Sequence, residues 1–354
     1  MIDALLKRAV DFKASDIHMT VGLEPMLRVH GRLNKFGNTP LKEEDIDQCV
    51  NHVLRDRVNG FEDLKTKGEI DFSYSLENVA RFRVNVFRQK GTYAIAFRVI
   101  SSTIPRMEDL GLPVKILTSL AKKQRGLVLV TGPTGSGKST TLATMINYIN
   151  NTSGKHIITI EDPIEYLHEH KVSMVNQREI GSDTLSFANA LRGSLREDPD
   201  VILVGEMRDT ETISIALTAA ETGHLVFSTL HTIGAAKTVD RIVDSFPGEQ
   251  QQQVKSQLAT VIEAVISQQL VPKLGGGAVA ALEIMTATPA IRSLIREDKT
   301  HQMQSIIQTN AKEGMQTMDN ELLMYFKRGV IDIENLVRYA VDSDYIRTQV
   351  PGFF

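Results

Sequence analysis

The sequence predicts an α/β protein in which a small α+β domain precedes a larger domain built on a parallel sheet. Three observations support this prediction. Residues 70–99 alternate apolar and polar side chains with period two, whereas predicted strands and helices alternate between residues 127 and 245. The segment GPTGSGKST, residues 132–140, follows the first of those strands and has the spacing of a phosphate-binding loop.

Composition sets the broad class of the protein. The 354 residues are enough for two domains of ordinary size, and 42% of them are hydrophobic, as in globular proteins. No apolar run is long enough to span a bilayer and no secretory signal is visible, so we expect a cytoplasmic protein without direct membrane insertion. The single cysteine, Cys49, excludes an internal disulfide and a four-cysteine zinc site. A formal net charge of −3 argues against nucleic-acid binding.

Residues 1–100 form the predicted smaller domain. Residues 2–14 and about 43–58 have the apolar spacing of helices, with short extended pieces between them. A meander of three strands follows, and its polar face carries Arg81, Arg83 and Arg98. These arginines are either ordinary surface charges or a cationic face presented to an anion at the junction between domains.

A linker is predicted at residues 101–112, where periodicity stops and proline and glycine interrupt the chain. The larger domain then covers residues 113–354. A helix to about residue 124 leads into alternating elements, with strands at 127–131, 156–160, 201–205 and 225–230 and helices at 138–151, about 184–196, 209–221 and 235–245.

Beyond residue 247 the chain is expected to be mainly helical. A single long helix is predicted over residues 250–269, followed by a glycine turn at 275–277 and a strand over 278–285. The remaining predicted helices form a C-terminal extension from about residue 288, at 290–297, 317–328 and 332–340.

The glycine-rich loop is the predicted cradle for nucleotide phosphates. Its glycines let backbone N–H groups converge on an anion, and the helix that begins at Lys138 favours negative charge at its N-terminus. We expect the Lys138 ammonium to reach the β- and γ-phosphates of ATP and the Ser139 hydroxyl to bind Mg²⁺. The predicted nucleotide-binding residues of the loop are Gly132, Pro133, Thr134, Gly135, Ser136, Gly137, Lys138, Ser139 and Thr140.

Polar side chains follow three of the predicted strands, at Glu161, Glu206 and His231. If these strands are neighbours, the three side chains meet near the phosphates, because the carboxyl ends of parallel strands share one edge of the sheet. Glu206 is the candidate for orienting the attacking water, and Glu161 either does the same or holds a metal-bound water. His231 either hydrogen-bonds the γ-phosphate or is a capping or core histidine.

Arg192 and Arg196 lie four residues apart in a predicted helix and would share one of its faces. Either they form surface ion pairs with neighbours such as Glu197, or they reach a nucleotide in an adjacent subunit. In the second case an arginine would stabilise the charge that develops during phosphoryl transfer.

Together these motifs resemble those of the secretion ATPase superfamily, whose members power pilus assembly, pilus retraction and type II secretion. GPTGSGKST is similar to its Walker A motif, and the similar segments elsewhere are IEDPIE (160–165), DPDVILVGEMRD (198–209), GHLVFSTLHT (223–232) and ASDIHM (14–19). The resemblance implies a RecA-like P-loop ATPase domain with C-terminal helices and a PAS-like N-terminal domain. Gly205 stands where a Walker B motif often has aspartate, so the catalytic role falls to Glu206. The implied nucleotide-contacting arginines are Arg83, Arg98, Arg192 and Arg196.

Within this superfamily, AIRSLIRE at residues 290–297 resembles the AIRNLIRE helix of type IV pilus retraction ATPases. The resemblance implies a Mg²⁺-dependent, homohexameric motor that drives pilus retraction and twitching motility. It would act at the cytoplasmic face of the inner membrane on a pilus platform protein, with other pilus ATPases as further partners. The alternatives are a pilus-extension or type II secretion ATPase, a DNA-translocating or conjugation ATPase, and a regulator that binds ATP without turnover.

Overall fold

The computed structural model describes residues 2–29, 31–55, 57, 59–77, 79–100 and 103–353. They form two compact units, and the first contains the chain up to Thr103 together with Pro163–Leu167 and Glu179–Asp183. The second unit contains Ile104–Asp162, His168–Arg178 and the chain from Thr184 onward. Ser101 and Ser102 of the predicted linker lie outside the described residues, and the domain division at 101–112 stays a prediction.

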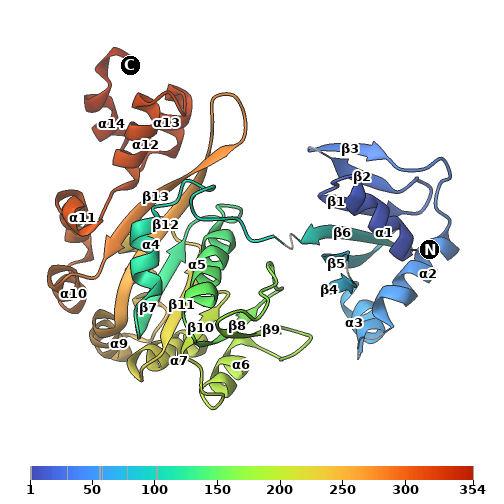
Figure 1. Cartoon of the computed structure of the whole chain (residues 1–354), viewed down its shortest axis with the longest axis horizontal. Helices are drawn as coiled ribbons and strands as arrows, with labels where there is room; N and C mark the ends of the chain where they lie inside the picture. The colour runs from blue at the N-terminus through green and yellow to red at the C-terminus, as the bar shows by residue number, and fades with distance from the viewer. Residues whose placement is uncertain are drawn as a thin grey trace. The chain divides into compact units, whose positions relative to one another are not determined.

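The described residues of the first unit form an antiparallel sheet and three helices. The strands are β1 (Asp16–Thr20), β2 (Met26–Val29), β3 (Arg32–Lys35), β4 (Glu69–Leu76), β5 (Ala80–Gln89) and β6 (Thr92–Ile100). Their order is β3-β2-β1-β6-β5-β4 (Figure 1), so the predicted meander is confirmed as β4, β5 and β6. The helices are α1 (Ile2–Asp11), α2 (Glu43–Leu54) and α3 (Gly60–Lys67).

The core of the first unit lies between these helices and the apolar face of the sheet. Phe82, Val84 and Val86 of β5 are fully buried and belong to the same cluster as Leu6 of α1 and Ile46 of α2. From Phe82 to Val86 every second residue of β5 is buried, which is the pattern that sequence periodicity predicts for a strand with one apolar face.

The predicted helix over 43–58 is shorter in the structure and is followed by a second helix. The first, α2, ends at Leu54, while Asp56 and Val58 lie outside the described residues. Asn59 has a left-handed φ of 64° before α3 begins. Among the apolar side chains of α3, only Leu64 is fully buried, so this helix lacks the repeated apolar spacing that would have predicted it.

The second unit is a seven-stranded sheet flanked by helices. Its strands are β7 (Gly126–Thr131), β8 (His156–Glu161), β9 (Met174–Glu179), β10 (Val201–Val204), β11 (Leu225–Leu230), β12 (Ile262–Pro272) and β13 (Ala278–Thr286). Their order is β13-β12-β7-β11-β10-β8-β9 (Figure 1). The strands from β12 to β8 in this order are parallel, and β13 pairs with β12 in the antiparallel direction. The predicted α/β fold is confirmed.

Helices connect these strands and extend beyond them. The helices up to β12 are α4 (Val114–Ala121), α5 (Lys138–Thr152), α6 (Phe187–Ser194), α7 (Thr210–Glu221), α8 (Ala235–Asp244) and α9 (Gly248–Val261). The C-terminal α-helices are α10 (Pro289–Arg296), α11 (Met303–Thr309), α12 (Met318–Lys327), α13 (Ile333–Tyr339) and α14 (Ser343–Gln349). Short 3₁₀ turns lie at Thr300–Gln302, Ala311–Glu313 and Pro351–Phe353. No α-helix or 3₁₀ helix among the described residues is long and apolar enough to cross a membrane.

The predicted long helix over 250–269 is wrong. Helix α9 ends at Val261, and the chain continues as β12 between β7 and β13. Six consecutive residues of β12, from 264 to 269, are buried, so both faces of the strand are covered. A strand buried on both faces loses the alternation that distinguishes it from a helix.

A buried carboxyl group joins the C-terminal helices to β13. Glu321 of α12 accepts hydrogen bonds from the backbone N–H of Leu282 and, at 2.8 Å, from Gln316 Nε2. The Tyr325 hydroxyl lies 3.2 Å from Glu321 Oε1 and 2.9 Å from the backbone oxygen of Ala280. Burial raises the pKa of Glu321 to about 7 despite these donors. The Tyr325 hydroxyl has one proton for these two acceptors, and protonation of Glu321 would let the carboxyl group donate to the Tyr325 oxygen instead.

Replacing Glu321 by glutamine is expected to remove a pH dependence of stability. The folded-state pKa lies above the unfolded value, so the contribution of Glu321 is fully present below about pH 4.3 and is lost as the pH rises through 7. The loss amounts to about 4 kcal/mol at most. Urea unfolding at pH 5 and pH 8 measures it, with the exposed Glu334→Gln as control. An equal pH dependence in wild type and Glu321→Gln would contradict this assignment.

Candidate active site

The phosphate-binding loop leaves a fully buried strand and enters a helix. All six residues of β7 are buried, and α5 begins at Lys138. Gly132, Gly135 and Gly137 have φ angles of 141°, 79° and 86°, in the region that favours glycine. The predicted strand, glycine turn and helix are therefore confirmed as local structure.

Two polar groups of the loop are arranged for an anion. Lys138 is 8% exposed, and its ammonium donates at 2.9 Å to the backbone oxygens of both Gly132 and Pro133. The Ser136 hydroxyl is buried and has no hydrogen-bond partner among the residues that the structure describes. A phosphate bound in the loop would supply the acceptor that Ser136 lacks, because buried polar groups are normally paired.

The loop also fits a metal ion that arrives with its nucleotide. The described residues contain no group of three or more histidine, cysteine, aspartate or glutamate side chains that would hold a metal ion. Mg²⁺ needs no such group, because it keeps several waters and takes few protein ligands besides substrate phosphates. Ser139, the predicted ligand, is half-buried at the second position of α5.

The three strands that lead to Glu161, Glu206 and His231 are neighbours in the sheet. This arrangement is required if the three side chains are to lie close together. β8, β10, β11 and β7 lie side by side in that order and are all parallel (Figure 1). Val204 at the end of β10 is level with Ile160 on β8 and with Ser228 on β11. The residues after these strands therefore share one edge of the sheet with the phosphate-binding loop.

Glu206 and His231 contact each other at that edge. His231 Nε2 lies 3.4 Å from Glu206 Oε2, and the Glu206 side chain is only 12% exposed. The other oxygen, Oε1, lies 2.6 Å from Nη2 of Arg208, a residue that sequence reasoning did not single out. The sequence offers little to mark Arg208, which is a single cation two residues after Glu206. The Thr229 hydroxyl donates at 2.6 Å to the backbone oxygen of Gly205 and so fixes the strand end.

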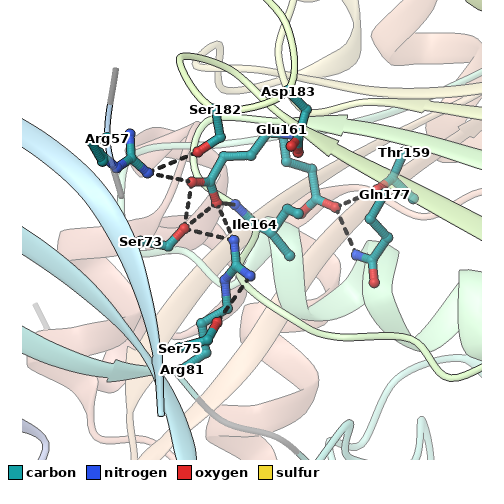
Figure 2. Close-up of polar contacts among 11 residues, drawn as sticks. Arg57, Ser73, Ser75, Arg81, Thr159, Glu161, Ile164, Gln177, Ser182 and Asp183 are labelled. Carbon is teal, nitrogen blue, oxygen red and sulfur yellow. Dashed lines mark hydrogen bonds and ion pairs between the residues drawn. The ribbon is translucent and has the colours of Figure 1, made fainter. Parts of the chain in front are cut away.

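Glu161 has a different set of partners. Its Oε1 accepts from the Thr159 hydroxyl at 2.7 Å and from Gln177 Nε2 at 3.2 Å (Figure 2). Both donors hold the carboxylate at the end of β8, and Gln177 comes from the edge strand β9, which the sequence did not predict. A carboxylate that is fixed in this way can hold a metal-bound water, which is the second of the two roles predicted for Glu161.

Glu179 is a buried carboxylate of the first unit that sequence reasoning missed. It is 2% exposed and accepts from Arg81 Nη2 at 2.7 Å, from the Ser73 hydroxyl and from the backbone N–H of Ile164 at 3.2 Å. These three partners are labelled in Figure 2. Arg57 Nη2 lies 3.7 Å away. Burial alone would raise the pKa of Glu179, but the hydrogen bonds from Ser73 and Arg81 hold it below its usual range. Arg81 is therefore the partner of a buried acid.

Each predicted arginine of the first unit has an acidic partner. Arg83 and Arg98 lie opposite each other on β5 and β6, as the shared polar face predicted. Arg98 Nε donates to Asp16 at 2.8 Å, and Arg83 Nε lies 3.6 Å from Asp71.

The arginines near α6 differ from the prediction in one respect. Arg192 pairs with Glu211 of α7 on the protein surface. Helix α6 ends at Ser194, so Arg196 lies beyond it and the two arginines do not share a helical face. Glu197, the expected neighbour, pairs with Arg178 instead.

A cavity of about 400 Å³ lies beside the phosphate-binding loop. Gly137, Thr140 and Thr141 line one side and residues 108–112 line another. The rest comes from β12, β13 and Lys273 between them. Apolar side chains such as Leu270 give it the character of a pocket for a base and sugar. Its walls come from three distant segments, so no local pattern in the sequence marks it.

Both the sequence and the fold of this chain are similar to those of known proteins. The family model for type II/IV secretion system proteins matches residues 1–277. The type IV pilus retraction ATPase PilT of Pseudomonas aeruginosa is 53% identical over 94% of this chain and 96% of its own. A twitching motility protein of Neisseria gonorrhoeae is 54% identical over 90% of this chain and 85% of its own. The crystal structure of the pilus retraction motor PilT with bound ADP matches with a TM-score of 0.91 and 49% identity, covering 98% of this chain and 99% of that one.

Proposed function

Because the chain belongs to the type II/IV secretion system protein family, we propose that it is the ATPase that drives type IV pilus retraction and so twitching motility. The observation that supports this most directly is the phosphate-binding loop with Glu206 and His231 at the adjacent strand ends. The chain is similar over nearly its whole length to a pilus retraction ATPase, which favours retraction over pilus extension, type II secretion or DNA translocation.

The residues of the site have distinct roles in this proposal. The loop N–H groups, Ser136 and Lys138 bind the phosphates of ATP, and the adjacent cavity receives the base and ribose. Mg²⁺ bound with ATP would neutralise charge on the phosphates, and Ser139 is the residue that would hold it. Glu206 orients the attacking water and accepts its proton, for which its contact with Arg208 must open.

The other polar residues at this edge of the sheet assist the same reaction. His231, beside Glu206, contacts the γ-phosphate. Glu161, fixed by Thr159 and Gln177, holds a second water. Its position also makes it the alternative to Glu206 as the residue that orients the attacking water, and the exchange of the two roles is testable by substitution.

We further propose that the protein works as a homohexameric ring at the cytoplasmic face of the inner membrane. In a ring, a nucleotide bound to one subunit lies within reach of its neighbour, which gives a role to the arginines Arg83, Arg98, Arg192 and Arg196. On contact with the nucleotide, these arginines would leave their acidic partners and bind phosphate oxygens instead. The ring would act on an inner-membrane pilus platform protein, with other pilus ATPases as further partners.

Phosphate release and pilus behaviour together test the function. The purified protein is expected to release phosphate from ATP only with Mg²⁺, and Lys138→Ala is expected to release none because it lacks the ammonium at the phosphates. A strain deleted for the protein should assemble fibres that do not retract, and wild type but not Lys138→Ala should restore retraction at equal protein levels. Loss of the fibres themselves would favour an extension ATPase, and a several-fold stimulation by DNA would favour a translocase.

A further inference from the structure

A buried glutamine on β12 holds the phosphate-binding loop. Gln268 is 2% exposed, its Oε1 accepts from the Thr141 hydroxyl at 2.7 Å, and its Nε2 donates to the backbone oxygen of Ser136 at 2.7 Å. We propose that Gln268 is a positioning residue that fixes the loop in its phosphate-binding conformation. This role depends on the proposed nucleotide site. It adds to that site a residue of β12, a strand that contains none of the sequence motifs named above.

The register of the sheet places Gln268 at the point where the loop leaves β7. Ser267 of β12 is level with Thr131, the last residue of β7, so Gln268 lies beside the first residues of the loop. A Cβ atom at Gly132 would overlap the backbone oxygen of Gln268, and one at Gly137 would lie 2.8 Å from Gln268 Nε2. Glycine is therefore needed at both positions because the loop packs directly against this residue, as well as for its φ angles.

The two hydrogen bonds of Gln268 lie on either side of Gly137 and Lys138, the residues of the loop nearest to the start of α5. Ser136 lies just before Gly137 and Lys138, and Thr141 lies in the first turn of α5. Fixing Ser136 and Thr141 fixes the direction of the N–H groups between them and the point from which the Lys138 side chain extends. Preorganised donors of this kind bind an anion without paying for rearrangement when it arrives.

Only an amide of this length makes both bonds at once. It offers an acceptor to Thr141 and a donor to Ser136, whereas leucine offers neither and a carboxylate offers no donor. Leucine would leave the Ser136 oxygen and the Thr141 hydroxyl unpaired, and Thr141 is only 1% exposed. Glutamate would in addition place a negative charge next to the phosphates. The expected order of nucleotide affinity is therefore wild type, then Gln268→Leu, then Gln268→Glu.

The neighbouring glutamine on the same strand provides a matched control. Gln269 is 8% exposed, and its Nε2 donates to the backbone oxygen of Tyr339 at 3.3 Å, in the C-terminal helices. Successive residues of a strand point to opposite faces, so Gln269 makes a similar buried contact away from the loop. Gln269→Leu thus reports the general effect of losing a buried glutamine from β12.

The test is equilibrium binding of a fluorescent ADP analogue to full-length variants, followed by steady-state kinetics. Gln268→Leu is expected to raise the Kd for the analogue and the KM for ATP about tenfold to a hundredfold, since two buried hydrogen bonds are lost. kcat should change far less, and Gln269→Leu should bind within about twofold of wild type. Thermal unfolding without nucleotide shows whether each variant is folded.

A double-mutant cycle makes the test specific. Thr141→Val removes the donor to Gln268 Oε1 at nearly constant shape and is expected to weaken binding several-fold. Combined with Gln268→Leu it should add little, because the two residues share one bond. This single variant also tests the proposal if Gln268→Leu does not fold.

Two results would overturn the inference. One is wild-type affinity in Gln268→Leu or in Thr141→Val, and the other is an equal loss of affinity in Gln269→Leu. Failure of the proposed function is a separate outcome, because wild type itself would then not bind the ADP analogue.

Discussion

Replacing Glu206 by glutamine is expected to lower kcat for ATP hydrolysis by about two to four orders of magnitude. The amide keeps the size of the carboxylate and can still accept a hydrogen bond from Arg208. It cannot accept the proton of the attacking water, which is the role proposed for Glu206. Steady-state phosphate release measures the loss, and the Kd for an ADP analogue should stay within a few-fold of wild type because Glu206 does not form the phosphate-binding loop.

The same assay on Glu161→Gln distinguishes the two candidate acids. Glu161 is held by Thr159 and Gln177, so glutamine there is expected to reduce kcat less than glutamine at position 206. A larger loss in Glu161→Gln would exchange the two roles. Full activity in Glu206→Gln would remove this residue from the mechanism altogether.

Replacing Glu179 by alanine is expected to lower the free energy of unfolding of the first unit by about 3–5 kcal/mol. The change leaves the guanidinium of Arg81, which is 19% exposed, without its buried counter-charge and the N–H of Ile164 without its acceptor. Urea unfolding followed by circular dichroism measures the loss. In Glu179→Ala, hydrogen exchange should become faster than in wild type at residues 163–167 and 179–183, and should change less in the second unit.

Two comparisons make the Glu179 result specific. Glu179→Gln keeps a hydrogen-bond acceptor and should lose less, while Glu169→Ala at an exposed site should stay within about 0.5 kcal/mol of wild type. The pKa of Glu179 is lowered by folding, so its contribution is present above the unfolded pKa and is lost as the pH falls. The gap between wild type and Glu179→Ala should therefore narrow in acid. An unchanged stability at neutral pH would contradict the burial argument.

The local structure of the candidate nucleotide site was largely predictable because its signals are local. The loop is a continuous segment whose glycines fit its φ angles. His231 directly follows the buried strand β11, and Glu206 comes two residues after the buried strand β10. Parallel pairing then brings these strand ends to one edge, so a correct list of strands was enough to place both residues.

The parts that were missed depend on contacts between distant segments. β12 was predicted as helix because both of its faces are buried, and the contacts of its Gln268 with the phosphate-binding loop were missed for the same reason. Arg81 was expected to be either a surface charge or part of a cationic face, because its partner, Glu179, lies 98 residues further along the chain. The prediction that Arg192 and Arg196 share one helical face failed because α6 ends at Ser194. The end of a helix is set by packing and capping, which residue spacing alone does not determine.

The return of the chain to the first unit at Pro163–Leu167 and Glu179–Asp183 limits how this protein can be taken apart. A gene fragment that stops at Thr103 encodes the first unit without the segments that contain Ile164 and Glu179. A fragment that starts at Ile104 carries those segments without their sheet. The N-terminal unit therefore cannot be exchanged as one continuous segment. A chimaera joined at the linker would pair Arg81 of one parent with residue 179 of the other. Segments 163–167 and 179–183 have to come from the same parent as the N-terminal sheet.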